Sequence, residues 1–272
     1  MAMPSAKEAH MSILEKLFHK KEIAEKQRKY DEYKEKFKGL GIEFLCTNDL
    51  EIAYLEKVYN QFVILFNDNP EIPKGFLSKV YVGNQAWYEE LENVKRYNHI
   101  LGSTHWYSEN NKLLVSIFIS TGEMNEYIFD LREKTLHIDK GKTIESVVTH
   151  EFSHLMEYYI LYKKNNWKDI NDIEKAYNAV NMREEKGNQI VSEEKELMDM
   201  CDDIIKLYGV SREFRFRILD SVGSRLGSNA THNYQEFFAE AMAQYYCSSN
   251  PDPMAITMYN EFKKMKKRFM EN

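Results

Sequence analysis

The sequence predicts an α+β fold, with a small mixed sheet in the N-terminal half and a helical half after it. Short apolar, strand-like runs occur only before residue 140, whereas apolar residues recur at helical spacing after residue 142. The chain holds 5 Pro and 11 Gly in 272 residues, where average usage would give roughly 13 and 19. This scarcity disfavours a sandwich or propeller with many tight turns. The separation of strands from helices favours α+β over alternating βαβ units.

The first element expected is a long charged helix over residues 6–38, a stretch without Pro or Gly that ends at Gly39. We therefore divide the chain into an N-terminal charged helix, residues 1–40, and one domain, residues 41–272. The helix is an activation segment, a partner-binding arm or part of the fold, and the sequence does not choose among these.

The remaining elements follow from apolar periodicity and turn residues. In the first half we expect strand 42–45, helix 50–67, strand 80–82, a hairpin over 103–119 that turns at Asn110-Asn111, and a second hairpin over 126–139. In the second half we expect helices 143–163, 171–182, 192–208, 211–226, 233–247 and 254–270.

Charge and composition narrow the class of protein. Residues 1–41 and 261–272 each carry a net +3, which leaves −12 for the segment between them. The basic ends are mixed-sign runs typical of solvated helices, so we expect no nucleic-acid partner.

No apolar run approaches the roughly 20 residues of a membrane span. The N-terminus has no apolar signal-peptide core, so the chain is expected to be cytoplasmic as synthesised. Three widely spaced cysteines predict no disulfide framework.

The strongest chemical motif is the pentad HEFSH at residues 150–154, which matches HExxH. On a helix, His150 and His154 lie one turn apart on the same face, so both imidazoles can reach one metal ion. Glu151 then lies beside that ion, where its carboxylate can take a proton from a zinc-bound water. An accidental HExxH with two surface histidines is the alternative, and a third ligand would argue against it.

A third ligand is available on the helix expected over 233–247, where Glu236 and Glu240 stand four residues apart among apolar residues. Two carboxylates on a largely buried helix are unfavourable unless something compensates their charge. A zinc ion bound by one of them, with the other hydrogen-bonded to a ligating histidine, would do so. The residues alone leave open which glutamate binds the metal, and whether either faces solvent instead.

The segments HEFSH and QEFFAEAMAQYY together resemble the catalytic domain of the anthrax lethal factor type, a family similar to the bacterial Pro-Pro endopeptidases. Its members are gluzincins, so the resemblance implies a zincin-like fold, a peptide or protein substrate and a Zn²⁺ cofactor. It implies that His150, His154 and Glu236 are the metal ligands. It further implies that Glu151 is the general base of a zinc metallopeptidase and that Glu240 orients a ligating histidine. The similarity extends over about residues 42–250.

The chain departs from this family at two places. Ser153 stands where the family usually has Gly, and its small size should be tolerated. The family also places a tyrosine, which stabilises the oxyanion, seven residues before the glutamate ligand, and here that position is Asn229. A small insertion would put Leu226 in the tyrosine's place, and Tyr234 and His232 are the nearby candidates for its role. Loss of one oxyanion donor lowers turnover by about 10²–10³.

Two alternatives to an active peptidase follow. One is a catalytically weak or inactive zincin-like structural or interaction module, because related sequences occur fused to phage head-assembly and toxin proteins. That resemblance also leaves open a phage association or release by an unconventional route. The other is a helical DNA- or partner-binding protein with an accidental HExxH, which would bind no stoichiometric zinc. The oligomeric state is not predicted.

Two features near the motif have open interpretations. The apolar strand 113–120 is either the edge strand to which an extended peptide could add or an ordinary core strand. The aromatic run His105-Trp106-Tyr107 either lines a cleft or packs in an aromatic cluster.

Overall fold

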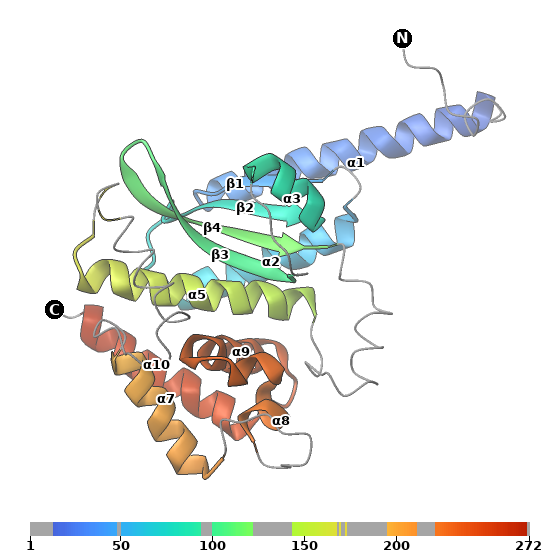
Figure 1. Ribbon diagram of the computed structural model, residues 1–272. Helices are drawn as coiled ribbons and strands as arrows, with labels where there is room; N and C mark the ends of the chain where they lie inside the picture. The colour runs from blue at the N-terminus through green and yellow to red at the C-terminus, as the bar shows by residue number, and fades with distance from the viewer. Residues whose placement is uncertain are drawn as a thin grey trace.

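A mixed sheet with helices on both faces forms one part of the protein, and a group of helices packed on α5 forms the other (Figure 1). The computed structural model describes residues 13–47, 50–93, 100–121, 143–167, 169, 172, 195–210 and 221–270. The strands are β1 (Glu43–Cys46), β2 (Leu77–Gly83), β3 (Gly102–Glu109) and β4 (Lys112–Ser120). The helices are α1 (Ile13–Gly39), α2 (Ile52–Asp68), α3 (Gln85–Glu92), α5 (Ile144–Lys164), α7 (Lys195–Tyr208), α8 (Val222–Leu226), the 3₁₀ helix η4 (Ser228–Thr231), α9 (Tyr234–Cys247) and α10 (Pro253–Met270). This arrangement confirms the α+β class.

The strand order in the described sheet is β1-β2-β4-β3. β1, β2 and β4 are parallel, while β3 runs antiparallel to β4, so the expected mixed sheet is confirmed. The hairpin between β3 and β4 turns at Asn110 and Asn111, whose φ angles are 50° and 61°. Asparagine tolerates this left-handed conformation, and two such residues in succession match the twist of the flanking strands.

Side chains alternate between two apolar layers across the sheet. Tyr81 and Phe118 point to the face that α3 covers and pack with Tyr88. Val80 and Ile117, each one residue earlier, point to the opposite face and belong to the main core, which α1, α2 and α5 share. The sheet therefore separates a small cluster under α3 from the large core on which α5 rests.

The C-terminal part of α1 belongs to that main core. Tyr30, Tyr33 and Phe37 are buried, and the Phe37 ring stacks on Phe44 of β1 at 4.4 Å between centroids. Toward its N-terminus α1 extends away from the sheet (Figure 1), and Ile23 there is 55% exposed. The last turns of this charged helix are thus part of the fold.

The second part of the protein is built around α9, which lies along α5 (Figure 1) and also contacts α7 and α10. Ala239, Ala241 and Ala243 are buried, and such small side chains permit close approach of neighbouring helices. Phe238 of α9 packs on Phe262 of α10 with ring centroids 4.7 Å apart. α9 is therefore the central helix of this group, with α5 on one side and α10 on another.

Helix α3 differs from the expected order of elements, and several expected segments lie outside the described residues. Helix α3 was not expected; the Asn84 side chain caps it by accepting a hydrogen bond from the Trp87 N–H at 2.9 Å. The expected hairpin 126–139, the helix 171–182 apart from residue 172, and residues 211–220 lie outside the described residues. In the part of the chain that the structure describes, no helix is long and apolar enough to span a membrane.

The packing of α1 predicts that Phe37→Ala destabilises the protein by about 3–5 kcal/mol, since it removes a fully buried ring from the core. Ile23→Ala, on the exposed part of the same helix, should change the free energy of unfolding by less than about 0.5 kcal/mol. Urea denaturation monitored by circular dichroism measures both. Equal effects of the two substitutions would contradict the assignment of the end of α1 to the core.

Candidate metal centre

Helix α5 presents the HExxH pentad between the sheet and α9 (Figure 1). Its start is set by a capping box: Thr143 Oγ1 accepts from the Ser146 N–H at 3.2 Å, and Ser146 Oγ accepts from the Thr143 N–H at 2.9 Å. Phe152 is fully buried against Phe62 and Phe66 of α2. With Phe152 held in the core, His150 and His154 face α9.

Helix α9 brings the carboxylates to these histidines. Asn233 caps the helix, because its Oδ1 accepts a hydrogen bond from the Glu236 N–H at 2.8 Å. Glu236 therefore lies in the first turn of α9, and Glu240 lies one turn further along the same side. The structure brings the three ligands implied by the resemblance together at the α5–α9 contact.

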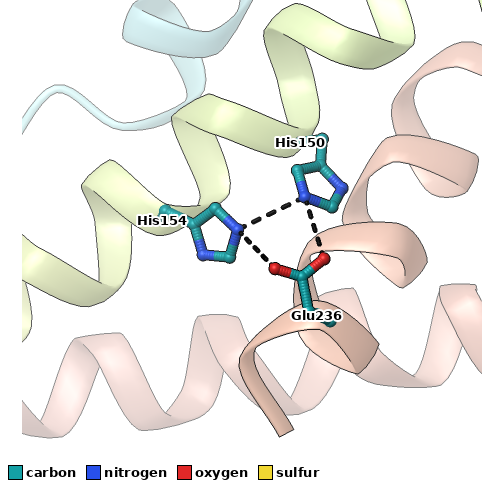
Figure 2. Close-up of side chains that lie close together, drawn as sticks. All are labelled: His150, His154 and Glu236. Atoms are coloured by element: carbon teal, nitrogen blue, oxygen red, sulfur yellow. Dashed lines mark hydrogen bonds and ion pairs between the residues drawn. The ribbon is translucent and has the colours of Figure 1, made fainter. Parts of the chain in front are cut away.

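The three candidate ligands form a small triangle (Figure 2). His150 Nε2 and His154 Nε2 are 3.3 Å apart. Glu236 Oε2 lies 3.3 Å from His150 Nε2, and its Oε1 lies 3.5 Å from His154 Nε2. The two glutamate distances end on different carboxylate oxygens; with one ligand atom taken from each residue, the three atoms lie within 4.8 Å of one another, so the group could hold a single ion. In a search of the described residues for His, Cys, Asp and Glu side chains that could together hold a metal ion, this group was found.

The far side of each imidazole meets a further carboxylate. Glu240 Oε1 lies 3.2 Å from His150 Nδ1, and Glu157 Oε2 lies 3.0 Å from His154 Nδ1. Both glutamates are buried. Both histidines thus point Nε2 toward Glu236 and Nδ1 toward a supporting carboxylate. The position of Glu240 agrees with the orienting role implied by the resemblance, whereas Glu157 was not singled out from the sequence.

The charges of this cluster are strongly coupled. Burial opposes protonation of His150, but Glu240 and Glu236 outweigh it and raise its pKa to about 9. Burial acts in the same way on His154, and Glu157 and Glu236 raise its pKa well above the usual value. For Glu236, burial opposes ionisation, yet the two histidines hold its pKa below the usual value. Without a metal, the imidazoles carry the positive charge that the carboxylates require.

Glu151 is held on the side of α5 that faces the sheet. Thr104 of β3 donates its hydroxyl to Glu151 Oε2 at 2.8 Å and lies 2.9 Å from the main-chain oxygen of the same residue. Gly102 lies so close that a Cβ atom there would stand 2.6 Å from Glu151 Oε1. Burial raises the pKa of Glu151, which suits a group that must accept a proton near neutral pH.

Ser153 fits where the resemblance places a glycine. Its side chain is fully buried, and its hydroxyl donates to the Thr149 main-chain oxygen one turn earlier at 2.7 Å. The added hydroxyl is therefore hydrogen-bonded within α5 and stays out of the metal centre.

The candidate oxyanion donors have the following positions. The Tyr234 hydroxyl donates to Asp202 Oδ1 of α7 at 3.0 Å. His232 is exposed after η4, and Leu226, at the end of α8, is buried. Asn229 lies within η4. The role of Tyr234 or His232 as the oxyanion donor stays a prediction.

The two open interpretations near the motif now have answers. β4, which contains residues 113–120, lies between β2 and β3, so of the two interpretations left open the core strand is the one confirmed. The edge strands of the described sheet are β1 and β3. Trp106 is buried and stacks on Tyr158 at 4.8 Å between centroids, so it packs in an aromatic cluster.

Two residues that support the centre were missed from the sequence. Glu157 follows His154 by three residues on the same helix, a spacing that places neighbours on one face, so the motif could have been read as HExxHxxE. Thr104 is 47 residues from Glu151, and only the position of β3 against α5 reveals its contact.

Comparisons with protein-family models, with curated proteins and with solved structures found no match to this chain.

The coupled charges predict that metal binding releases protons. Because the pKa of His150 is raised to about 9, its imidazole is protonated at pH 7 and must lose a proton to bind a metal through Nε2. Zinc affinity should therefore rise between pH 6 and pH 8, by about tenfold per pH unit for each proton displaced. Titration calorimetry in buffers of different ionisation enthalpy counts these protons. A pH-independent affinity would contradict the assignment.

Proposed function

We propose that this protein is a zinc-dependent metalloendopeptidase in which Glu151 is the general base. The observation that carries the proposal is the triangle of His150, His154 and Glu236, whose ligand atoms lie within 4.8 Å of one another and could hold one metal ion. Two imidazoles and one carboxylate are a donor set typical of catalytic zinc, which leaves a position open for water or substrate.

When bound, zinc would polarise the scissile carbonyl and make a bound water acidic. Glu151 would take a proton from the attacking water and then deliver it to the leaving amine nitrogen. The hydrogen bond from Thr104 holds one carboxylate oxygen of Glu151, so the other oxygen, Oε1, would carry the proton. The raised pKa of Glu151 favours its protonated form, which is the form that must donate to the amine.

The neighbouring edge strand supports a peptide substrate. β3 contributes Gly102 and Thr104 to the surroundings of Glu151, and β3 is one of the two edge strands of the described sheet. An extended peptide could pair with such an edge through main-chain hydrogen bonds and so lie next to the base. Together with the ligand triangle, this arrangement supports the proposal that the chain shares the zincin-like fold of the lethal factor-type gluzincins.

A catalytically weak or inactive zincin-like module is the second candidate. It is favoured by one observation, the hydrogen bond from the Tyr234 hydroxyl to Asp202. To stabilise an oxyanion, Tyr234 would have to leave this acceptor. His232, the other candidate, is exposed.

The proposal predicts that Glu151→Gln lowers peptide-bond cleavage by at least about 10²-fold, since the amide cannot act as a base. Zinc content should stay at one equivalent, because Glu151 is not a ligand. Cleavage of a peptide library is followed by mass spectrometry, and zinc by elemental analysis. Glu261→Gln, an exposed change on α10, is the matched control. Undiminished cleavage by Glu151→Gln would refute the assigned base, and zinc-loaded wild-type protein without any cleavage would favour the inactive module.

If Tyr234 is the oxyanion donor, Tyr234→Phe should reduce turnover by about 10²–10³ with unchanged zinc content. Tyr208→Phe, which removes a hydroxyl bonded to Pro253 and Thr257, controls for the loss of a helix contact on α7. Steady-state kinetics on the cleaved peptide measure both variants. Unchanged turnover in Tyr234→Phe would remove this residue from the mechanism, and His232→Ala would then test the other candidate.

A further inference from the structure

We propose that Glu157 is a positioning residue of the metal centre, which holds the His154 imidazole from behind so that Nε2 is presented to the metal. The inference rests on the proposed zinc site and adds a residue to it. No part of the HExxH motif or of the family resemblance assigns a role to Glu157.

The contact is short and buried. Glu157 Oε2 lies 3.0 Å from His154 Nδ1, and the side chains of Glu157 and His154 are only 4% and 14% exposed. A carboxylate this deeply buried is unfavourable unless it is hydrogen-bonded or paired. Its location three residues after His154 on α5 places both side chains on one face of the helix.

The chemistry of the pair determines which nitrogen can bind a metal. A carboxylate accepts hydrogen bonds, so the contact favours the tautomer in which Nδ1 of His154 is the donor. In the neutral imidazole, the lone pair is then on Nε2, the atom that lies 3.5 Å from Glu236 Oε1. A carboxylate behind a ligating histidine also increases the basicity of the imidazole, which strengthens the metal bond.

Glu157 is within hydrogen-bond geometry of His154 Nδ1, whereas Glu240 lies at ion-pair distance from His150 Nδ1, and the two carboxylates come from different elements. Glu240 reaches His150 from α9, so its contact exists only when α9 is packed on α5. Glu157 and His154 both belong to α5, so this half of the site can be oriented within one helix. Removing Glu157 should therefore weaken the metal site while α9 still packs on α5.

The test measures zinc affinity by competition with a chromophoric chelator, on the full chain and without reference to peptidase activity. Glu157→Gln keeps an oxygen that accepts the Nδ1 proton but loses the charge, and should weaken zinc binding by about 10-fold. Glu157→Leu keeps the approximate size but cannot accept a hydrogen bond, and should weaken binding by about 100-fold. Glu240→Gln should resemble Glu157→Gln, and Glu261→Gln should bind zinc like the wild type.

The zinc affinities of the two folded variants, compared with their melting temperatures, separate a positioning role from a purely structural role. A buried ion pair that only stabilised α5 would lower the melting temperature of both metal-free variants without changing the zinc affinity of the folded protein. Circular dichroism checks that each variant is folded, and Glu157→Gln decides the question if Glu157→Leu does not fold. Affinities of the folded variants within twofold of the wild type would overturn the inference alone. Failure of the wild-type protein to bind zinc would overturn the proposed function together with it.

Discussion

The contact between α5 and α9 is the interaction on which the candidate site depends. It places Glu236 and Glu240 of one helix against His150 and His154 of the other, in a region that Glu157 also shares. Three carboxylates here require positive charge, because uncompensated burial of a charged group is costly. The raised pKa values of both histidines show how the metal-free protein meets this requirement. A divalent ion could meet it instead, so the same packing that joins the two parts of the protein also assembles the group that could hold a metal.

Strand β3 of the sheet positions Glu151, whereas α9 positions the carboxylates that face the two histidines. Thr104 bonds its carboxylate, and Gly102 leaves the space in which that carboxylate lies. The Tyr158 hydroxyl in turn donates to the main-chain oxygen of Thr104 at 3.3 Å, which ties β3 to α5 a second time. Trp106, two residues along β3, stacks on the same tyrosine. The candidate base is thus held between a strand and its own helix, independently of α9, so the ligand set and the base are positioned by two different interfaces.

The parts of this arrangement that could be predicted from sequence are those encoded within one helix. His150 and His154, or Glu236 and Glu240, are four residues apart, and helical periodicity alone places each pair on one face. Thr104 and Gly102 could not be found in this way, since their contact with Glu151 depends on which strand lies at the sheet edge. The sequence likewise left open whether residues 113–120 form an edge strand or a core strand. A continuous apolar run is typical of a strand covered on both faces, and β4 is indeed covered by α3 on one face and the main core on the other.

The first turn of α9 holds both a candidate metal ligand, Glu236, and a candidate oxyanion donor, Tyr234. Glu236 is held in the first turn by the Asn233 cap, and Tyr234, at the first helical position, is bonded to Asp202 of α7. Any movement that released Tyr234 from Asp202 by shifting this turn would also move a candidate metal ligand. A side-chain rotation of Tyr234 would leave Glu236 in place, since the cap acts on the main chain. Catalysis through Tyr234 is therefore compatible with an intact ligand triangle only if the side chain moves and the α9 backbone does not.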